Sequence, residues 1–228
     1  MSTSWAERFP LVFQLYSMSA KGTPGNYFEM ENVERALTDG EQFFIDLEQM
    51  FERLDPVAWQ MFKSRTAPYV HKLDEWGYSK QLFERFHEAD GYGFLKSDGY
   101  QDIRFLPEDT GKPMPDLEAR DQGRLVLMEV KTVNESDNQK RYFETSLVSR
   151  DALPVERRVP AGLRHKLEAA IAKAAEQLLS IQDPAVQRRI VYLFVRLDFH
   201  LHAVNELEQL LADEHHPGVE ICWRVLRP

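Results

Sequence analysis

Little in this chain supports disulfide chemistry or a membrane span. Its 228 residues include one cysteine, Cys222, which rules out an intrachain disulfide and a thiol-rich metal site. No apolar run is long enough to cross a bilayer. The apolar patch near the start is interrupted by Pro10 and Gln14, which disfavours a secretory signal peptide. We therefore expect a cytoplasmic protein with no membrane partner.

Several catalytic motifs are missing as well. The chain has no glycine-rich phosphate loop and no G-x-S-x-G sequence, which argues against kinase, NTPase and esterase chemistry. Its net charge of −9 argues against a protein that coats nucleic acid, because phosphate binding relies on Lys and Arg. Any contact with nucleic acid must therefore be local.

The most informative stretch covers residues 115–132 and reads PDLEARDQGRLVLMEVKT. Its apolar run, residues 125–130, predicts a central strand that is buried on both faces. Glu129 interrupts this run, and Lys131 follows it. Because strand side chains alternate, both charges point to the same face of the predicted sheet.

A second carboxylate is expected beside these two charges. The turn residues Gln122-Gly123 predict a hairpin between residues 113–120 and 124–133, which allows Asp116 to lie on the face of Glu129 and Lys131. Two converging carboxylates suit a hard divalent cation such as Mg²⁺, and a nearby lysine can orient water or stabilise charge on a phosphate. The alternative is an ordinary buried ion pair, which rarely repays its desolvation.

At these residues the sequence resembles the PD-(D/E)XK nuclease superfamily, which has the restriction-endonuclease-like fold. Pro115-Asp116 and Glu129-Val130-Lys131 match the two halves of its motif. The resemblance implies an α-β-β-β-α-β core and nucleic-acid cleavage that requires Mg²⁺ or Mn²⁺. It also implies that Asp116, Glu129 and the Val130 carbonyl bind the metal, while Lys131 orients the attacking water or stabilises charge.

Further acids could assist at such a site. In the superfamily a helix before the sheet often supplies another glutamate, and Glu84 and Glu88 are the candidates here. Their angular position relative to Leu82 instead predicts that both face solvent. Glu118 shares the face of Asp116, so it is either an accessory ligand or a solvent-facing side chain.

A helix is predicted over residues 163–181, where apolar residues recur at helical spacing. The superfamily often places a Lys or Gln from this helix near the metal, which makes Lys173 and Gln177 accessory candidates. A solvated helix face is the alternative for both.

A local basic region follows the motif strand. Residues 139–173 carry eight Lys or Arg and four Asp or Glu side chains. They either contact phosphates beside the metal site or form a solvated surface, and Tyr142 with Phe143 either stacks on bases or packs the loop. The nucleic-acid-binding candidates are Lys140, Arg141, Tyr142, Arg157, Arg158, Arg164 and Lys166.

The remaining elements follow from spacing and turn residues. We predict an irregular arm over residues 1–27 and a helical segment over 28–90, in which Asp55-Pro56 starts one helix and Pro68 ends or kinks it. Gly91, Gly93 and Gly99 are expected to break the next helix. Strands are expected over 100–106, 189–199 and 219–226, with a short helix at 138–147 and another at 204–214.

Together these features predict an α/β protein with a mixed five-stranded sheet. Residues 1–78 are expected to form an N-terminal arm and helical subdomain, and residues 79–228 a nuclease-like domain. The predicted function is hydrolysis of phosphodiester bonds, with DNA as the favoured substrate. Two alternatives remain: a non-catalytic nucleic-acid-binding or scaffold protein that keeps the fold, and a nuclease subunit that needs a partner. Either a homodimer or a partner protein fits the pattern.

Overall fold

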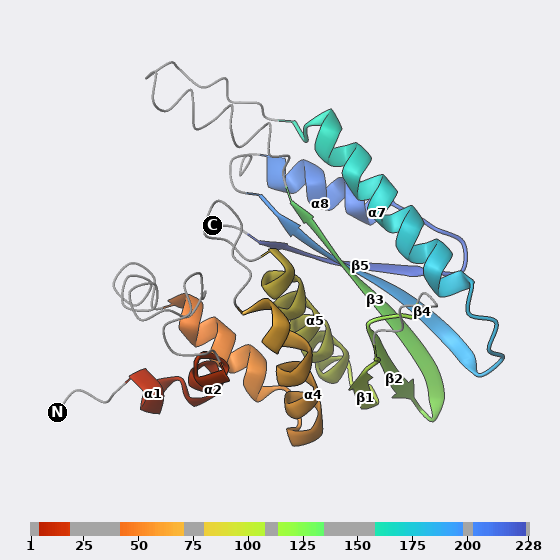
Figure 1. Cartoon of the computed structure of the whole chain (residues 1–228). Helices are drawn as coiled ribbons and strands as arrows, with labels where there is room; N and C mark the ends of the chain where they lie inside the picture. Colours follow the sequence, from red (N-terminus) through yellow and green to blue (C-terminus); the bar gives the residue numbers. More distant parts are fainter. Residues whose placement is uncertain are drawn as a thin grey trace, which may run out of the picture. The chain divides into compact units, whose positions relative to one another are not determined.

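The computed structural model describes residues 5–18, 42–70, 80–107, 114–134, 158–197 and 203–226 (Figure 1). Its contacts divide the chain into two compact units, residues 1–105 and 106–228. The division after residue 78 that the sequence suggested remains a prediction. Within the described segments, no helix combines the length and apolarity needed to cross a membrane. The predicted helix over 138–147 lies outside the described residues.

Helices dominate the first unit. An aromatic cluster fills its core, where the ring centroid of Phe51 lies 5.2 Å from that of Phe62 and 5.7 Å from that of Phe86. The aromatic residues of the helical segment therefore pack together as a core. The elements are α1 (Trp5–Arg8), α2 (Pro10–Met18), a helix over residues 42–52, α4 (Pro56–Thr66), the 3-10 helix Ala67–Tyr69, α5 (Lys80–Ser97) and β1 (Gln101–Phe105).

The prediction of an irregular arm is wrong for residues 5–18, which form α1 and α2. Proline is favoured at the first position of a helix, where Pro10 stands in α2, and Val12 and Leu15 bury the inner face. The Glu48 carboxylate accepts hydrogen bonds from the backbone N–H groups of Leu11 and Val12, at 2.8 and 3.0 Å. A carboxylate from a distant helix therefore caps α2, and sequence pattern alone gives no sign of it.

Helix α4 begins where the sequence predicts. The Asp55 side chain accepts hydrogen bonds from Val57 N and Ala58 N, and its other oxygen accepts one from the Tyr92 hydroxyl at 2.9 Å. The helix ends at Thr66, just before the 3-10 turn that contains Pro68. Both predicted boundaries are confirmed.

Asp55→Ala removes this cap and leaves the Tyr92 hydroxyl without its acceptor. We expect the free energy of unfolding to fall by about 1–2 kcal/mol. Urea denaturation followed by circular dichroism measures the change. Asp98→Ala, which removes an exposed carboxylate from the turn after α5, is the control and is expected to change stability by less than about 0.5 kcal/mol. Equal effects in the two variants would contradict the capping role.

The prediction that Gly91 and Gly93 break the third helix is wrong, because α5 continues to Ser97. Gly93 lies against the side chain of Arg53, and a Cβ there would come within 3.0 Å of Arg53 Cδ. The glycine therefore serves a close helix contact rather than a break. The turn after the helix contains Gly99, whose φ of +86° suits glycine.

The second unit contains most of the sheet. Its elements are β2 (Leu117–Asp121), β3 (Arg124–Asn134), α7 (Ala161–Leu179), β4 (Val186–Arg196), α8 (Val204–Asp213) and β5 (Glu220–Leu226). The strand order is β1-β2-β3-β4-β5, with β2 antiparallel to β3, and β3, β4 and β5 parallel to one another. The chain is therefore an α/β protein with a mixed five-stranded sheet, as predicted.

The hairpin of β2 and β3 closes through Gln122 and Gly123, whose φ angles are +50° and +84°. Positive φ at both central residues is typical of the two-residue turn whose twist matches that of the strands. The resulting register pairs Asp121 with Arg124 and Leu117 with Met128. The turn thus determines which residues of the two strands lie opposite each other.

Helices α7 and α8 lie on the same side of the sheet formed by β3, β4 and β5 (Figure 1). Their apolar residues form one core with the strand residues that face them. Glu129 pairs with Val191, and Lys131 pairs with Leu193, so both charged residues belong to this helix-covered face. The buried residues of this core include Leu127, Val133, Leu163, Leu167, Ile171, Val191, Leu193, Val195, Leu207 and Leu211.

Candidate active site

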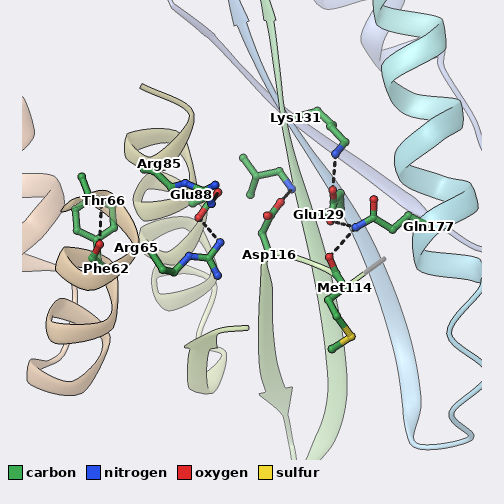
Figure 2. A network of polar contacts seen from close by, with 11 residues as sticks. Phe62, Arg65, Thr66, Arg85, Glu88, Met114, Asp116, Glu129, Lys131 and Gln177 are labelled. Atoms are coloured by element: carbon green, nitrogen blue, oxygen red, sulfur yellow. Dashed lines mark hydrogen bonds and ion pairs between the residues drawn. The ribbon is translucent and has the colours of Figure 1, made fainter. Parts of the chain in front are cut away.

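Asp116 lies immediately before β2, where two backbone contacts fix its position. Its carbonyl accepts a hydrogen bond from Leu106 N at 2.9 Å, and its carboxylate Oδ2 accepts one from Val130 N at 2.8 Å. Because Leu117 pairs with Met128, Asp116 lies next to Glu129 across the hairpin. The structure therefore brings together the two acids that the sequence singled out (Figure 2).

Glu129 lies in the middle of β3 and is only 3% exposed. Its Oε1 forms an ion pair with the Lys131 ammonium, and its Oε2 accepts a hydrogen bond from Gln177 Nε2 at 2.8 Å (Figure 2). Lys131 is more open, with 26% of its side chain exposed. The carboxylate is thus held from both sides, while the lysine reaches toward solvent.

Opposing effects act on the Glu129 carboxylate. Burial, and after it the negative charge of Asp116, raise the pKa of Glu129 from 4.5 to about 7 against the opposing effect of Lys131. Lys131 therefore lowers the pKa of Glu129 by less than burial and Asp116 together raise it. A bound cation at this position would favour the ionised form of Glu129.

Gln177 is the accessory residue that the structure connects to the site. Its side-chain Nε2 donates both to Glu129 and to the backbone carbonyl of Met114, at 2.8 and 2.7 Å. It thereby ties α7 to β3 and to the segment that leads into Asp116. Lys173, one turn earlier on α7, is exposed, which agrees with the solvated alternative for that residue.

Gln177→Ala removes the donor shared by Glu129 and Met114. We expect a loss of about 1–3 kcal/mol in the free energy of unfolding, because the buried Glu129 carboxylate loses a donor, while the exposed Met114 carbonyl can turn to water. The proposed metal affinity should also fall, since Glu129 is then less well oriented. Lys173→Ala is the matched control on the same helix, and urea denaturation with metal titration measures both variants. Equal behaviour of the two variants would contradict the positioning role of Gln177.

The backbone at Val130 is arranged unusually for an antiparallel pair. Continuing the register two residues beyond Leu117 sets Pro115 opposite Val130. Proline has no amide hydrogen, so this position cannot donate to the Val130 carbonyl, and the Val130 N–H is taken by Asp116 instead. In an antiparallel pair, the N–H and C=O groups of one residue point toward the same neighbouring strand. Because the Val130 N–H points toward Asp116, the Val130 carbonyl points to that side as well.

Among the other candidate acids, Glu88 differs most clearly from its predicted exposure. It was expected to face solvent but is buried within the first unit, where it pairs with Arg65 at 2.9 Å and with Arg85 at 2.5 Å. Two guanidinium groups offset the cost of burying one carboxylate. Glu84 is half-buried and lies 4.0 Å from Lys80. Glu118 lies opposite Leu127 in the hairpin and is half-buried.

Three of the proposed nucleic-acid contacts fall on described residues. Arg158 is exposed just before α7, and Arg164 lies 3.7 Å from Glu206. Lys166 donates to the Asn134 carbonyl at 3.3 Å, at the end of β3. These basic groups therefore lie near the N-terminus of α7, while Lys140, Arg141, Tyr142 and Arg157 lie outside the described residues.

The donor set determines which metal the site could hold. Among the described residues, no group of three or more His, Cys, Asp or Glu side chains is placed to hold a metal. Asp116 and Glu129 offer two carboxylates, and the Val130 carbonyl a third oxygen. An all-oxygen set with few protein ligands fits Mg²⁺ or Mn²⁺, which keep several waters, and does not fit a structural zinc ion.

Comparisons with family models, with curated proteins and with solved structures found no match to this chain. The chemical interpretation of the site therefore depends on its own residues.

Proposed function

We propose that this protein is a divalent-metal-dependent nuclease that hydrolyses phosphodiester bonds, with DNA as the favoured substrate. One observation carries the proposal: Glu129 is buried directly beside Asp116, and burial together with that second carboxylate raises its pKa to about 7 although Lys131 is paired with it. An ion pair that only stabilises the fold needs one carboxylate and one lysine. A divalent-cation site, in contrast, needs the second carboxylate as a further ligand.

The order of elements gives separate support. Helix α5 is followed by β1, β2 and β3, then by α7 and β4. This succession agrees with the α-β-β-β-α-β core of the PD-(D/E)XK superfamily, which the motif residues resemble. The position of the acids on a hairpin, before β2 and within β3, also agrees with that resemblance.

Each residue of the site has a distinct role in this proposal. Asp116, Glu129 and the Val130 carbonyl would hold one or two cations. When bound, a divalent cation polarises a phosphoryl oxygen and lowers the pKa of water. Lys131, whose ammonium is paired with Glu129 but partly exposed, orients the attacking water and stabilises the charge that develops on phosphate. Gln177 keeps the Glu129 carboxylate in place.

Substrate binding is the task of basic side chains outside the acid pair. Arg158, Arg164 and Lys166 lie at or near the start of α7, and Lys166 contacts the backbone three residues beyond Lys131. Lys and Arg at this position suit contact with the phosphate backbone of a nucleic acid. The net charge of −9 keeps such contact local to this region.

Calorimetric titration with Mg²⁺ and Mn²⁺ tests the proposal at pH 8, where Glu129 is ionised. We expect binding to the native protein, and at least about tenfold weaker binding to Asp116→Ala and Glu129→Gln. Asp121→Asn is the matched control, because it removes a carboxylate from the turn end of the same hairpin. If the native protein binds neither ion, the proposal fails and the non-catalytic scaffold becomes the better account.

A further inference from the structure

The outer edge of β5 is a surface that the proposed nuclease site does not use. Strand β5 is last in the sheet order and pairs with β4, and no strand among the described residues lies on its other side. An edge of this kind presents N–H and C=O groups that are ready to pair with another strand. Its sequence, EICWRVL, contains none of the Pro, Gly or Lys residues that commonly block such pairing.

The side chains of β5 alternate between two faces. Glu220, Cys222 and Arg224 share a face with Tyr192 and Phe194, and the Arg224 guanidinium lies 5.8 Å from the centre of the Phe194 ring. Ile221, Trp223 and Val225 lie on the opposite face, against the core beneath α7 and α8. One face of the edge is therefore charged and the other apolar.

The strand is complementary to a second copy of itself in one antiparallel register. When two copies are centred on Cys222, Glu220 lies opposite Arg224 of the second copy, and Ile221 lies opposite its Trp223. Each contact occurs twice because the arrangement is symmetric. Shifting the centre by one residue or by half a residue breaks the charge pairs, so complementarity selects this register.

A groove beside the edge adds apolar surface to this pairing. Its volume is about 490 Å³, and its lining includes Ile221 and Trp223 of β5 together with Leu211, His215 and Pro217 from the end of α8 and the following turn. In the register centred on Cys222, Trp223 of the second copy lies opposite Ile221. Its indole is thereby brought to the groove.

We propose that β5 is a homodimer interface, in which two chains pair antiparallel about a two-fold axis at Cys222 and join their sheets into one. Within one chain, Glu220 also pairs with Arg188 at 2.5 Å. The Cys222 Sγ atom lies 3.8 Å from Glu220 Oε1. In the dimer Glu220 bridges Arg188 and Arg224 of the second copy. This proposal does not depend on the nuclease function.

Sedimentation velocity across a range of protein concentrations tests the dimer. Arg224→Glu turns two attractive cross-strand pairs into two repulsive ones, and we expect it to weaken dimerisation by roughly tenfold. The double variant Glu220→Arg with Arg224→Glu restores both cross-strand pairs but loses the pair of Glu220 with Arg188, so we expect it to recover most, though not all, of the native dimerisation. Arg124→Glu makes the same charge change at an exposed position at the start of β3, in the β2–β3 hairpin, and serves as control.

The position of Cys222 gives a second readout on the same variants. Directly opposed residues in an antiparallel pair have Cα atoms about 4.5–5.5 Å apart, which is within the range for a disulfide. Diamide, as two-electron oxidant, takes two electrons and two protons from the two thiols and leaves one S–S bond. We expect a disulfide-linked dimer in the native protein and the double variant, and much less in Arg224→Glu.

Two results would overturn the proposal. The first is a native protein that remains monomeric at all concentrations and forms a disulfide-linked dimer no faster than Arg224→Glu does. The second is a dimer whose affinity is the same in the native protein, Arg224→Glu and the double variant, because such a dimer uses another surface. Circular dichroism of each variant verifies that it is folded before these comparisons are made.

Discussion

Lys131→Ala is expected to lower the rate of nucleic-acid cleavage by about 10³-fold while leaving the fold intact. The ammonium of Lys131 is paired with Glu129, and its side chain is partly exposed, so water can enter the space that its removal leaves. What disappears is the positive charge that orients water and stabilises the charge growing on phosphate. Cleavage of end-labelled DNA under single-turnover conditions measures the effect.

The same change also affects Glu129, which has to be separated from the effect on cleavage. Lys131 lowers the pKa of Glu129, so its removal raises that pKa further and weakens cation binding near neutral pH. Assays at pH 8.5 with saturating Mn²⁺ avoid this difficulty. Lys173→Ala, on the exposed face of α7, is the control and should cleave at the native rate. Cleavage by Lys131→Ala at a rate near native would rule out the assigned role.

Glu129→Gln is expected to have opposite effects on stability and on activity. It should abolish cleavage, because it removes one of two carboxylate ligands. It should also stabilise the metal-free protein at pH 8 by an amount on the order of 3 kcal/mol, since an acid with a pKa near 7 in the fold and 4.5 when unfolded opposes folding once ionised. Stability given up at a functional site is common in enzymes.

The raised pKa of Glu129 predicts the pH range over which the free energy of unfolding changes. Below about pH 4.5 Glu129 is protonated in both the folded and the unfolded state, and it does not disfavour folding. Between pH 4.5 and 7 the unfolded chain releases the proton and the folded protein keeps it, so stability declines as pH rises. Above pH 7 the loss is constant.

Urea denaturation in EDTA at several pH values measures this window. The difference between Glu129→Gln and the native protein should be small at pH 4 and largest above pH 7. Adding Mg²⁺ at pH 8 should stabilise the native protein but not the variant, because metal binding is linked to folding. A variant that is less stable than the native protein at pH 8 without metal would contradict the raised pKa.

Local signals were sufficient to predict the hairpin that carries the site. The apolar run of β3 and the turn at Gln122-Gly123 are short-range features, and together they determine the register that sets Asp116 beside Glu129. Asp55-Pro56 was equally informative, because an N-terminal cap acts within one helical turn. These predictions depended on neighbours in sequence, which a single sequence contains.

Features that depend on distant residues were missed. Helix α2 is capped by Glu48, which lies 37 residues from Leu11, so the segment looked irregular. Glu88 looked solvent-exposed by its position on the helix, yet Arg65 of α4, together with Arg85 of the same helix, allows it to be buried. Gly93 looked like a helix breaker, but it makes room for Arg53. In each case the deciding partner comes from another element.

The choice between Gln177 and Lys173 required the packing of α7 on the sheet. The two residues lie four positions apart on one helical stripe, so periodicity cannot tell them apart. The structure connects Gln177 to Glu129 and to Met114 and leaves Lys173 exposed. The resemblance proposed both residues as accessory candidates, and only the tertiary contacts distinguish between them.

Cleavage of a panel of labelled DNA and RNA, circular and linear, tests the central claim most directly. The native protein and Asp116→Ala are compared with Mg²⁺, with Mn²⁺ and with EDTA. We predict cleavage by the native protein that requires the metal and is lost in Asp116→Ala. No cleavage of any substrate by a protein that also binds no metal, or cleavage that persists in Asp116→Ala, would contradict the assignment of a metal-dependent nuclease site to Asp116, Glu129 and Lys131.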